Sequence, residues 1–265
     1  MILSLLLVIT SPLSPSALPA PGLIAPAALV LSQDEPEDKR PEVKELCDTL
    51  GGHIGKRGDE DTEALKVIDT MLQEYKVSGP KDRGLIVKAL GKCYEQKRQP
   101  LEEGVPNNRL YLTATVALGE MGTDASKTLI KYIGHKKHRS DEGLQRELIL
   151  ALGKTKDPAG VKTLEGLLND KTDSLVGAAA EALGQYTELP LEDRKDIFNS
   201  LLKVLVTAKT VMDADAADIQ ARDRFDTIAG PISTTLKDLS GHEGARKPEE
   251  WQHWWNKNKK KDWDE

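Results

Sequence analysis

Apolar residues recur at helical spacing over most of the chain beyond residue 42. Between residues 148 and 184, Leu148, Ala151 and Leu152 form one apolar stripe. A second stripe follows at positions i, i+3, i+6 and i+7, namely Val161, Leu164, Leu167 and Leu168. This spacing predicts two amphipathic helices in succession, each burying one face against a neighbour.

The tripeptide Ala-Leu-Gly occurs four times and indicates an internal repeat. Its residues are Leu90 and Gly91, Leu118 and Gly119, Leu152 and Gly153, and Leu183 and Gly184. The intervals between the glycines are 28, 34 and 31 residues, which fits one helical hairpin per unit.

The turn within the clearest unit has its own local chemistry. Gly153 is expected to supply a left-handed residue that ends the first helix. Asp157 then offers a side-chain oxygen to the free amides of the next turn, and Pro158 fits the first helical position. A second helix is therefore predicted to begin there.

The segment from residue 148 to 184 resembles the short HEAT-like repeats of bacterial proteins, of the type first described in phycobilisome lyases. The shared features are an Asp-Pro turn, a Val-x-x-Leu-x-x-Leu-Leu helix and a following helix that ends in Ala-Leu-Gly. Gly177 stands where that family often has arginine. The resemblance implies an all-α, right-handed superhelical α-solenoid of about five helical hairpins, closed by a C-terminal cap helix.

The same pattern extends in both directions and predicts a solenoid over residues 43–240. Its helices are expected at five places. These are 64–75 with 85–94, 110–121 with 125–133, 148–152 with 161–168, 176–183 with 197–205, and 215–229 with 232–239. The last pair is predicted to break at Gly230 and Pro231.

Residues 241–265 are rich in tryptophan and close the chain. Trp251, Trp254 and Trp255 fall on one face of a helix that begins at Pro248. That face is expected to cover the open end of the solenoid, and an aromatic patch for a ligand is the alternative. The region also resembles the end of exported bacterial HEAT-like proteins. The lysines of 257–261, followed by acidic residues, are expected to be a solvated tail rather than an anionic-surface contact.

The first 32 residues carry no charge and differ from the remainder of the chain. Two short apolar runs, separated by prolines, are typical of a secretory signal peptide and too short for a bilayer span. Cleavage is expected between Ser32 and Gln33, which gives an exported protein, periplasmic or secreted, with no stable membrane span. Residues 33–42 are acidic and proline-containing and are expected to form a flexible linker.

The amino-acid composition and the net charge limit the fold class and the classes of partner that are expected. The chain is 38% hydrophobic but only 4% aromatic, and its apolar content is mainly alanine and leucine, which favours packed helices. The net charge of −6 argues against a broad nucleic-acid surface, so no nucleic acid is expected as a partner. Cys47 and Cys93 are the only cysteines. Export permits a disulfide between them, and two separate core thiols are the equal alternative.

Candidate chemistry is sparse. His135 and His138, three residues apart in a basic stretch, have no third metal ligand nearby and are expected in a solvated loop. A Gly-x-Ser-x-Gly elbow is missing, and Gly51 to Gly55 lacks the ending of a phosphate loop. We therefore expect no catalytic residue, no metal and no cofactor.

These features favour a non-catalytic scaffold that binds other proteins in the cell envelope or the secreted space. The alternative is a HEAT-like repeat enzyme, of the lyase or DNA-glycosylase kind, that uses the concave face of the solenoid. Export and net acidity argue against both of its substrates, a tetrapyrrole and a DNA lesion.

Overall fold

The fold is known from a computed structural model that describes residues 37–103, 105–215, 217–243, 245 and 247–264. The chain divides into two units, residues 1–34 and 35–265, and all the described residues belong to the second. The regular elements there are helices. They are α1 (Pro41–Gly55), α2 (Asp61–Val77), α3 (Pro80–Gly91), η1 (Lys92–Tyr94), α4 (Arg109–Glu120), η2 (Gly122–Ala125), α5 (Ser126–Tyr132), α6 (Glu142–Lys154), η3 (Pro158–Gly160), α7 (Val161–Leu167), α8 (Asp173–Leu183), α9 (Leu191–Ala214), α10 (Ile219–Ser240) and α11 (Pro248–Asn258).

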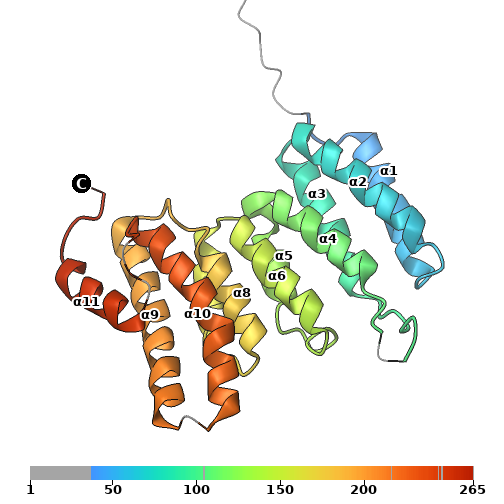
Figure 1. Cartoon of the computed structure of the whole chain (residues 1–265). Coiled ribbons are helices and arrows are strands. Elements are labelled where there is room, and N and C mark those ends of the chain that lie inside the picture. Colours follow the sequence, from blue (N-terminus) through green and yellow to red (C-terminus); the bar gives the residue numbers. More distant parts are fainter. Residues whose placement is uncertain (1–36, 104, 216, 244, 246, 265) are drawn as a thin grey trace, which may run out of the picture. The chain divides into compact units, whose positions relative to one another are not determined.

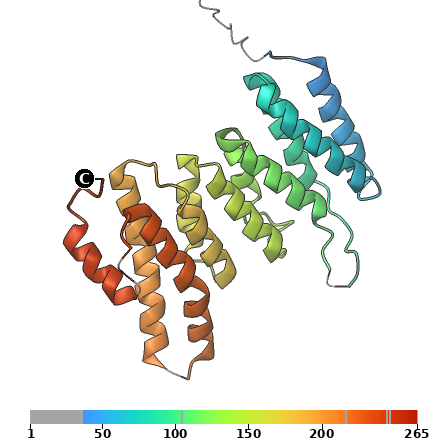
Figure 2. The same ribbon diagram turned by 45° about the horizontal axis from the view of Figure 1, so that its top comes forward.

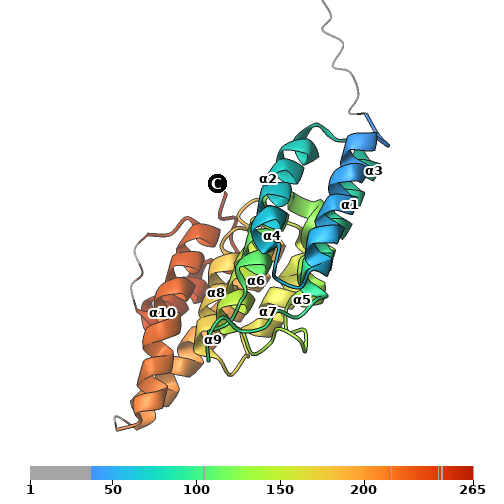
Figure 3. The same cartoon turned by 90° about the vertical axis from the view of Figure 1, so that its right-hand side faces the viewer.

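The helices of this unit form two rows. The even row runs α2, α4, α6, α8 and α10, and each of these helices packs against the next. The odd row begins with α1, α3 and α5, which also pack in succession, and continues through η3 and α7. Figures 1 and 2 show the even helices side by side along the chain, and Figure 3 shows the odd helices on the other side of them.

Several helix starts follow from the sequence. Asp157 accepts a hydrogen bond from the amide of Ala159 at 3.0 Å, and Pro158 occupies the first helical position, as predicted. Asp141 and Asp218 cap α6 and α10 in the same way. The side-chain oxygen satisfies an amide that has no partner inside the helix.

The glycines of the Ala-Leu-Gly tripeptides have a structural role that differs from the predicted one. Gly153 lies inside α6 and is not in the left-handed conformation, so the predicted C-cap role is wrong. A Cβ on Gly153 would lie 2.7 Å from the Cα of Ala182, and one on Gly119 would lie 3.3 Å from the Cα of Ala151. The glycine of one unit therefore faces the alanine of the next, which lets successive even-row helices touch through their backbones.

The first Ala-Leu-Gly is not equivalent to the other three. Gly91 ends α3 in the odd row, where a Cβ would lie 3.2 Å from Thr128 Cγ2 on α5. Gly184 continues the even-row pattern, but it faces Thr235 of α10 instead of an alanine. The irregular interval of 28 residues thus reflects a change of row.

The predicted break at Gly230 and Pro231 is wrong, because α10 runs unbroken from Ile219 to Ser240 with Pro231 inside it. Proline removes the hydrogen bond to the carbonyl of Thr227, four residues earlier. The Cβ position of Gly177 on α8 lies 3.7 Å from both that carbonyl and the Pro231 ring. The missing arginine at position 177 therefore leaves room for α10 to pack on α8.

The predicted flexible linker is only partly described, since residues 33–36 lie outside the described residues. Residues 37–42 are attached to the helices rather than free. The amides of Lys39 and Arg40 each donate to the buried carboxylate of Asp82 at 3.0 Å, and Asp38 Oδ1 accepts from the amides of Lys81 and Asp82. Pro41 and Glu42 already belong to α1.

Candidate functional site

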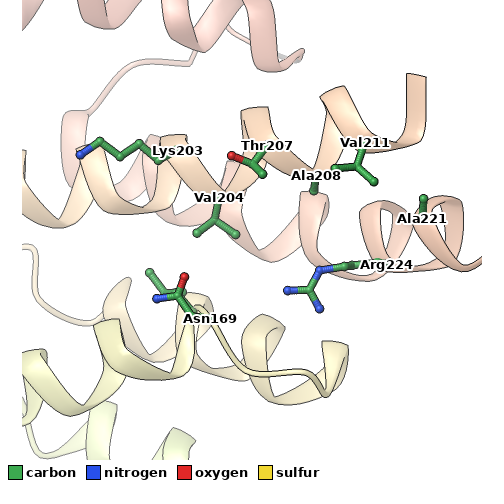
Figure 4. Close-up of a pocket in the computed structure, with 9 residues that line it drawn as sticks. Asn169, Lys203, Val204, Thr207, Ala208, Val211, Ala221 and Arg224 are labelled. Atoms are coloured by element: carbon green, nitrogen blue, oxygen red, sulfur yellow. The ribbon is translucent and has the colours of Figure 1, made fainter. Parts of the chain in front are cut away.

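A groove with a largely apolar lining lies between the last two long helices (Figure 4). Its volume is about 430 Å³. The lining comes from the turn after α7, from α9 and from the start of α10. The residues are Leu168, Asn169, Lys203, Val204, Thr207, Ala208, Val211, Ala221 and Arg224.

The groove has an apolar floor and polar edges. Leu168, Ala208 and Ala221 are buried at its base, while Val211 is 51% exposed. Figure 4 shows Val204 and Arg224 pointing into the space between the helices. Nearby Ile219, the first residue of α10, is 67% exposed, so apolar surface continues past the groove. Exposed apolar residues are common on soluble proteins, and Val211 and Ile219 are notable only because they flank a hollow with apolar walls.

Two cations stand at the edges of the groove and differ in their surroundings. The guanidinium of Arg224 bonds to the carboxylate of Asp173 and to the carbonyl of Asp170, which fixes α10 to the start of α8. Lys203 is exposed and has no ion-pair partner in the described part of the chain. The ammonium of Lys203 is therefore available to a carboxylate of a bound molecule.

The leucines named as repeat positions are core residues. Leu90, Leu118, Leu152, Leu164 and Leu183 are fully buried, and Leu167 is half-buried. These residues belong to the hydrophobic core and pack the rows together.

The tryptophans gather around one side chain of α9. Ring centroids of Trp251, Trp254 and Trp255 lie 5.9, 5.3 and 5.2 Å from that of Phe198, and Trp251 is 1% exposed. Trp263 joins them at 5.3 Å. The aromatic face of α11 therefore covers α9.

The segment after α11 is not a simple solvated tail. Trp263 donates its indole N–H to the carbonyl of Asn258 at 3.1 Å. Asp264 accepts from the guanidinium of the buried Arg194 at 2.6 Å. The lysines at 257 and 259–261 are exposed as expected. The chain thus folds back onto α9 as far as Asp264.

Cys47 and Cys93 are both free thiols in the structure. Cys93 is fully buried, and burial raises the pKa of its thiol to about 12. Burial also raises the pKa of Cys47, and the neighbouring Asp48 adds to this. Thiols held in the protonated form are poor nucleophiles, so neither cysteine is suited to catalysis.

The predicted solvated loop around His135 and His138 is wrong for His138, which is 4% exposed. Its Nε2 lies 2.8 Å from the carbonyl of Tyr94, and its ring lies edge-on to Tyr111 at 4.9 Å. Tyr94 in turn stacks on Tyr132 at 4.4 Å. Helical periodicity misses this cluster because its members come from the ends of three helices and a loop.

Acid is expected to destabilise the fold through His138. Burial, the largest cause, lowers the pKa of His138 below its ordinary value of 6.5. The unfolded chain then binds a proton that the folded chain does not, so the free energy of unfolding falls as pH drops below about 6.5. Urea unfolding between neutral and mildly acidic pH measures this fall, which His138→Gln should reduce. An equal fall in that variant would place the effect elsewhere.

The described residues contain no group of three or more His, Cys, Asp or Glu side chains arranged to hold a metal ion. Among the same residues, no helix has both the length and the apolar character needed to cross a bilayer.

A family model described as HEAT repeats matches residues 99–184, the stretch that contains α4 to α8. Residues 99–184 are HEAT repeats. The sequence resemblance is thereby confirmed over this stretch, together with the all-helical fold. No curated protein matches the chain. The groove of Figure 4 lies at the C-terminal edge of the HEAT segment, where the turn after α7 meets the longer helices α9 and α10.

Proposed function

We propose that the protein is a non-catalytic scaffold that binds other proteins, and that α9, α10 and the HEAT segment supply the binding surface. HEAT repeats generally mediate interactions between proteins. The groove beside α9 carries the proposal, because it combines an apolar floor with the free ammonium of Lys203. Such a site fits a segment of a partner that inserts apolar side chains and presents a carboxylate.

The fold that we propose for the whole repeat region is a right-handed superhelical α-solenoid, continuous through residues 43–240. The support is the close contact of successive even-row helices through Gly119, Gly153 and Gly184. A similar contact at equivalent positions favours a similar small rotation of each unit relative to the previous one, which is how solenoids acquire their curvature.

Val211→Asp is expected to weaken partner binding at the groove by about tenfold or more, because a charge would enter an apolar contact. Val211 is 51% exposed, so the fold should keep its thermal stability. The matched control is Val77→Asp, an equal change at a residue that is 59% exposed at the end of α2. The measurement is affinity purification from the native envelope fraction, carried out separately with wild type, Val211→Asp and Val77→Asp.

Proteins recovered with wild type and Val77→Asp but lost with Val211→Asp would support the scaffold and place its site. Recovery of the same proteins by all three would remove the groove from the proposal. Nothing above background, in any detergent or salt, would contradict the scaffold itself.

We also propose that the protein acts after export, in the periplasm or outside the cell. The uncharged residues 1–32, which lie outside the described residues, support this by their composition alone. Expression with its own leader should yield an exported chain that begins at Gln33, as read by N-terminal sequencing. A chain that keeps Met1 and stays in the cytoplasm would overturn the assignment.

A further inference from the structure

Three helices of the odd row, α3, α5 and α7, present only lysines as exposed charged groups, and a further exposed lysine opens η1 directly after α3. We call these residues the lysine face. They are Lys81, Lys88, Lys92, Lys127, Lys131 and Lys162. This is an unusual concentration of one sign of charge on a chain whose net charge is −6.

Acidic residues on the same helices do not neutralise the lysine face. Asp82 on α3 is fully buried and accepts the amides of Lys39 and Arg40. Glu165 on α7 is half-buried and accepts from the hydroxyl of Ser200 on α9 at 2.8 Å. The helix α5 contains no acidic residue.

In the even row, by contrast, three cations pair between neighbouring helices, among them Arg224 of α10 with Asp173 of α8. Lys154 on α6 bonds to Glu120 on α4, and Arg146 on α6 lies 3.6 Å from Glu181 on α8.

None of the six lysines of the lysine face has an ion-pair partner in the part of the chain that the structure describes. The ammonium of Lys131 lies 4.8 Å from the centroid of the Tyr132 ring, and this is a contact with an aromatic face rather than with a carboxylate.

The lysine face is continuous from helix to helix. Gly91 at the end of α3 lies close to α5, where a Cβ on it would lie 3.2 Å from Thr128. Lys92 directly follows Gly91, and Lys127 directly precedes Thr128. Ser126 at the start of α5 bonds to Asp157, which caps the turn leading into α7. Because the helices touch in this way, their exposed lysines are expected to share one surface.

The face also offers one apolar contact and a hollow at its edge. Leu85 on α3 is 45% exposed. It lies four residues after Lys81 and three before Lys88, so the three side chains share one side of the helix. Lys131 lines a hollow of about 410 Å³ with His135 and Lys137 of the following loop, and the same lining includes one carboxylate, that of Glu95. A ligand with carboxylates and at least one apolar side chain matches these features.

Acidic residues flank the lysine face on the neighbouring helices. The helix α1 exposes Glu45, together with Asp48 in an ion pair with Lys44, and the first turns of α9 expose Asp193 and Asp196. Since packed helices lie about 8–10 Å apart, three helices span only about 20–30 Å. A longer nucleic-acid duplex or a membrane plane would meet these carboxylates, whereas a short acidic segment would not.

We propose that the lysine face docks an acidic segment of a partner protein, a short stretch rich in aspartate and glutamate with an apolar side chain that contacts Leu85. This is a second surface of the scaffold proposed above, and it does not require the groove beside α9. Each carboxylate would replace solvent around a lysine that makes no ion pair within the described residues.

The test measures binding of a short fluorescein-labelled glutamate peptide with one central leucine, by fluorescence anisotropy with the full mature chain. At about 0.15 M salt, where the Debye length is about 8 Å, only a cluster of close charges retains affinity. The variant Lys88→Glu/Lys127→Glu/Lys131→Glu is expected to bind about tenfold or more weakly. The charge-matched control is Lys66→Glu/Lys76→Glu/Lys171→Glu, which changes exposed lysines elsewhere.

Peptide binding that survives in the control and in Val211→Asp, and that fails in the lysine-face variant, would support the proposal independently of the groove. Equal loss in both triple variants would overturn it, because only net charge would then matter. Tighter binding of duplex DNA or of phosphatidylglycerol vesicles to the same face would also overturn it. If the peptide fails to bind wild type, the proposal is also overturned, whereas the outcome of the groove experiment does not change.

Discussion

Gly153→Ala is expected to lower the free energy of unfolding by about 2 kcal/mol, although alanine is the better helix former. The added Cβ would lie 2.7 Å from both Cα and Cβ of Ala182 and 2.8 Å from its carbonyl oxygen. Two of these three are backbone atoms, so no side-chain rotation can relieve the clash. The helices α6 and α8 must separate, which opens the buried seam beside Leu152 and Leu183.

The matched control is Gly166→Ala on α7, where an added Cβ meets nothing within 4 Å. There alanine should stabilise the protein by about 0.5–1 kcal/mol, because glycine loses more backbone entropy on folding. Urea unfolding followed by far-ultraviolet circular dichroism compares the two variants. If both substitutions stabilised the protein, the close contact between α6 and α8 would be wrong.

The repeat could be found from the sequence because its signal is local. Ala-Leu-Gly recurs, and Asp157 with Pro158 starts a helix in the predicted way. The role of the glycines could not be found from local rules, since a glycine at a helix end and one at a helix contact look alike in sequence. Gly153 needs its small size because of Ala182, which lies on another helix.

Pro231 is a second position at which a local sequence rule predicts the wrong structure. A proline inside a helical pattern predicts a break, and the local reason is sound. The structure accommodates it because Gly177 on α8 leaves space for the proline ring and for the carbonyl of Thr227. Tertiary packing of α10 thus overrides a local preference, and the two predicted helices become one.

The candidate groove and the lysine face depend on which helices become neighbours. Leu168, Val204 and Arg224 meet in one groove only because α9 and α10 pack beside the turn after α7. The sequence contains no motif that joins them. His138 is a similar case, since its burial depends on Tyr94 and Tyr111 from other elements.

Phe198→Ala is expected to have the largest effect on the C-terminal cap. The Phe198 ring lies within 5.2–5.9 Å of four tryptophan rings and is fully buried. Its removal should cost about 3–5 kcal/mol, the usual range for deleting a buried aromatic ring. The helix α11 would lose its main contact with α9, since its aromatic residues converge on this one side chain.

Tryptophan fluorescence measures this directly, because all four tryptophans of the chain lie between residues 251 and 263. Phe198→Ala should shift the emission to longer wavelength as the indoles gain water, and should expose α11 to limited proteolysis. The matched control is Phe225→Ala on α10, a half-buried residue and the only other phenylalanine. Its emission should stay close to that of wild type. An unchanged emission in Phe198→Ala would mean that other contacts hold α11 in place. The ion pair between Arg194 and Asp264 would then be the next contact to test by substitution.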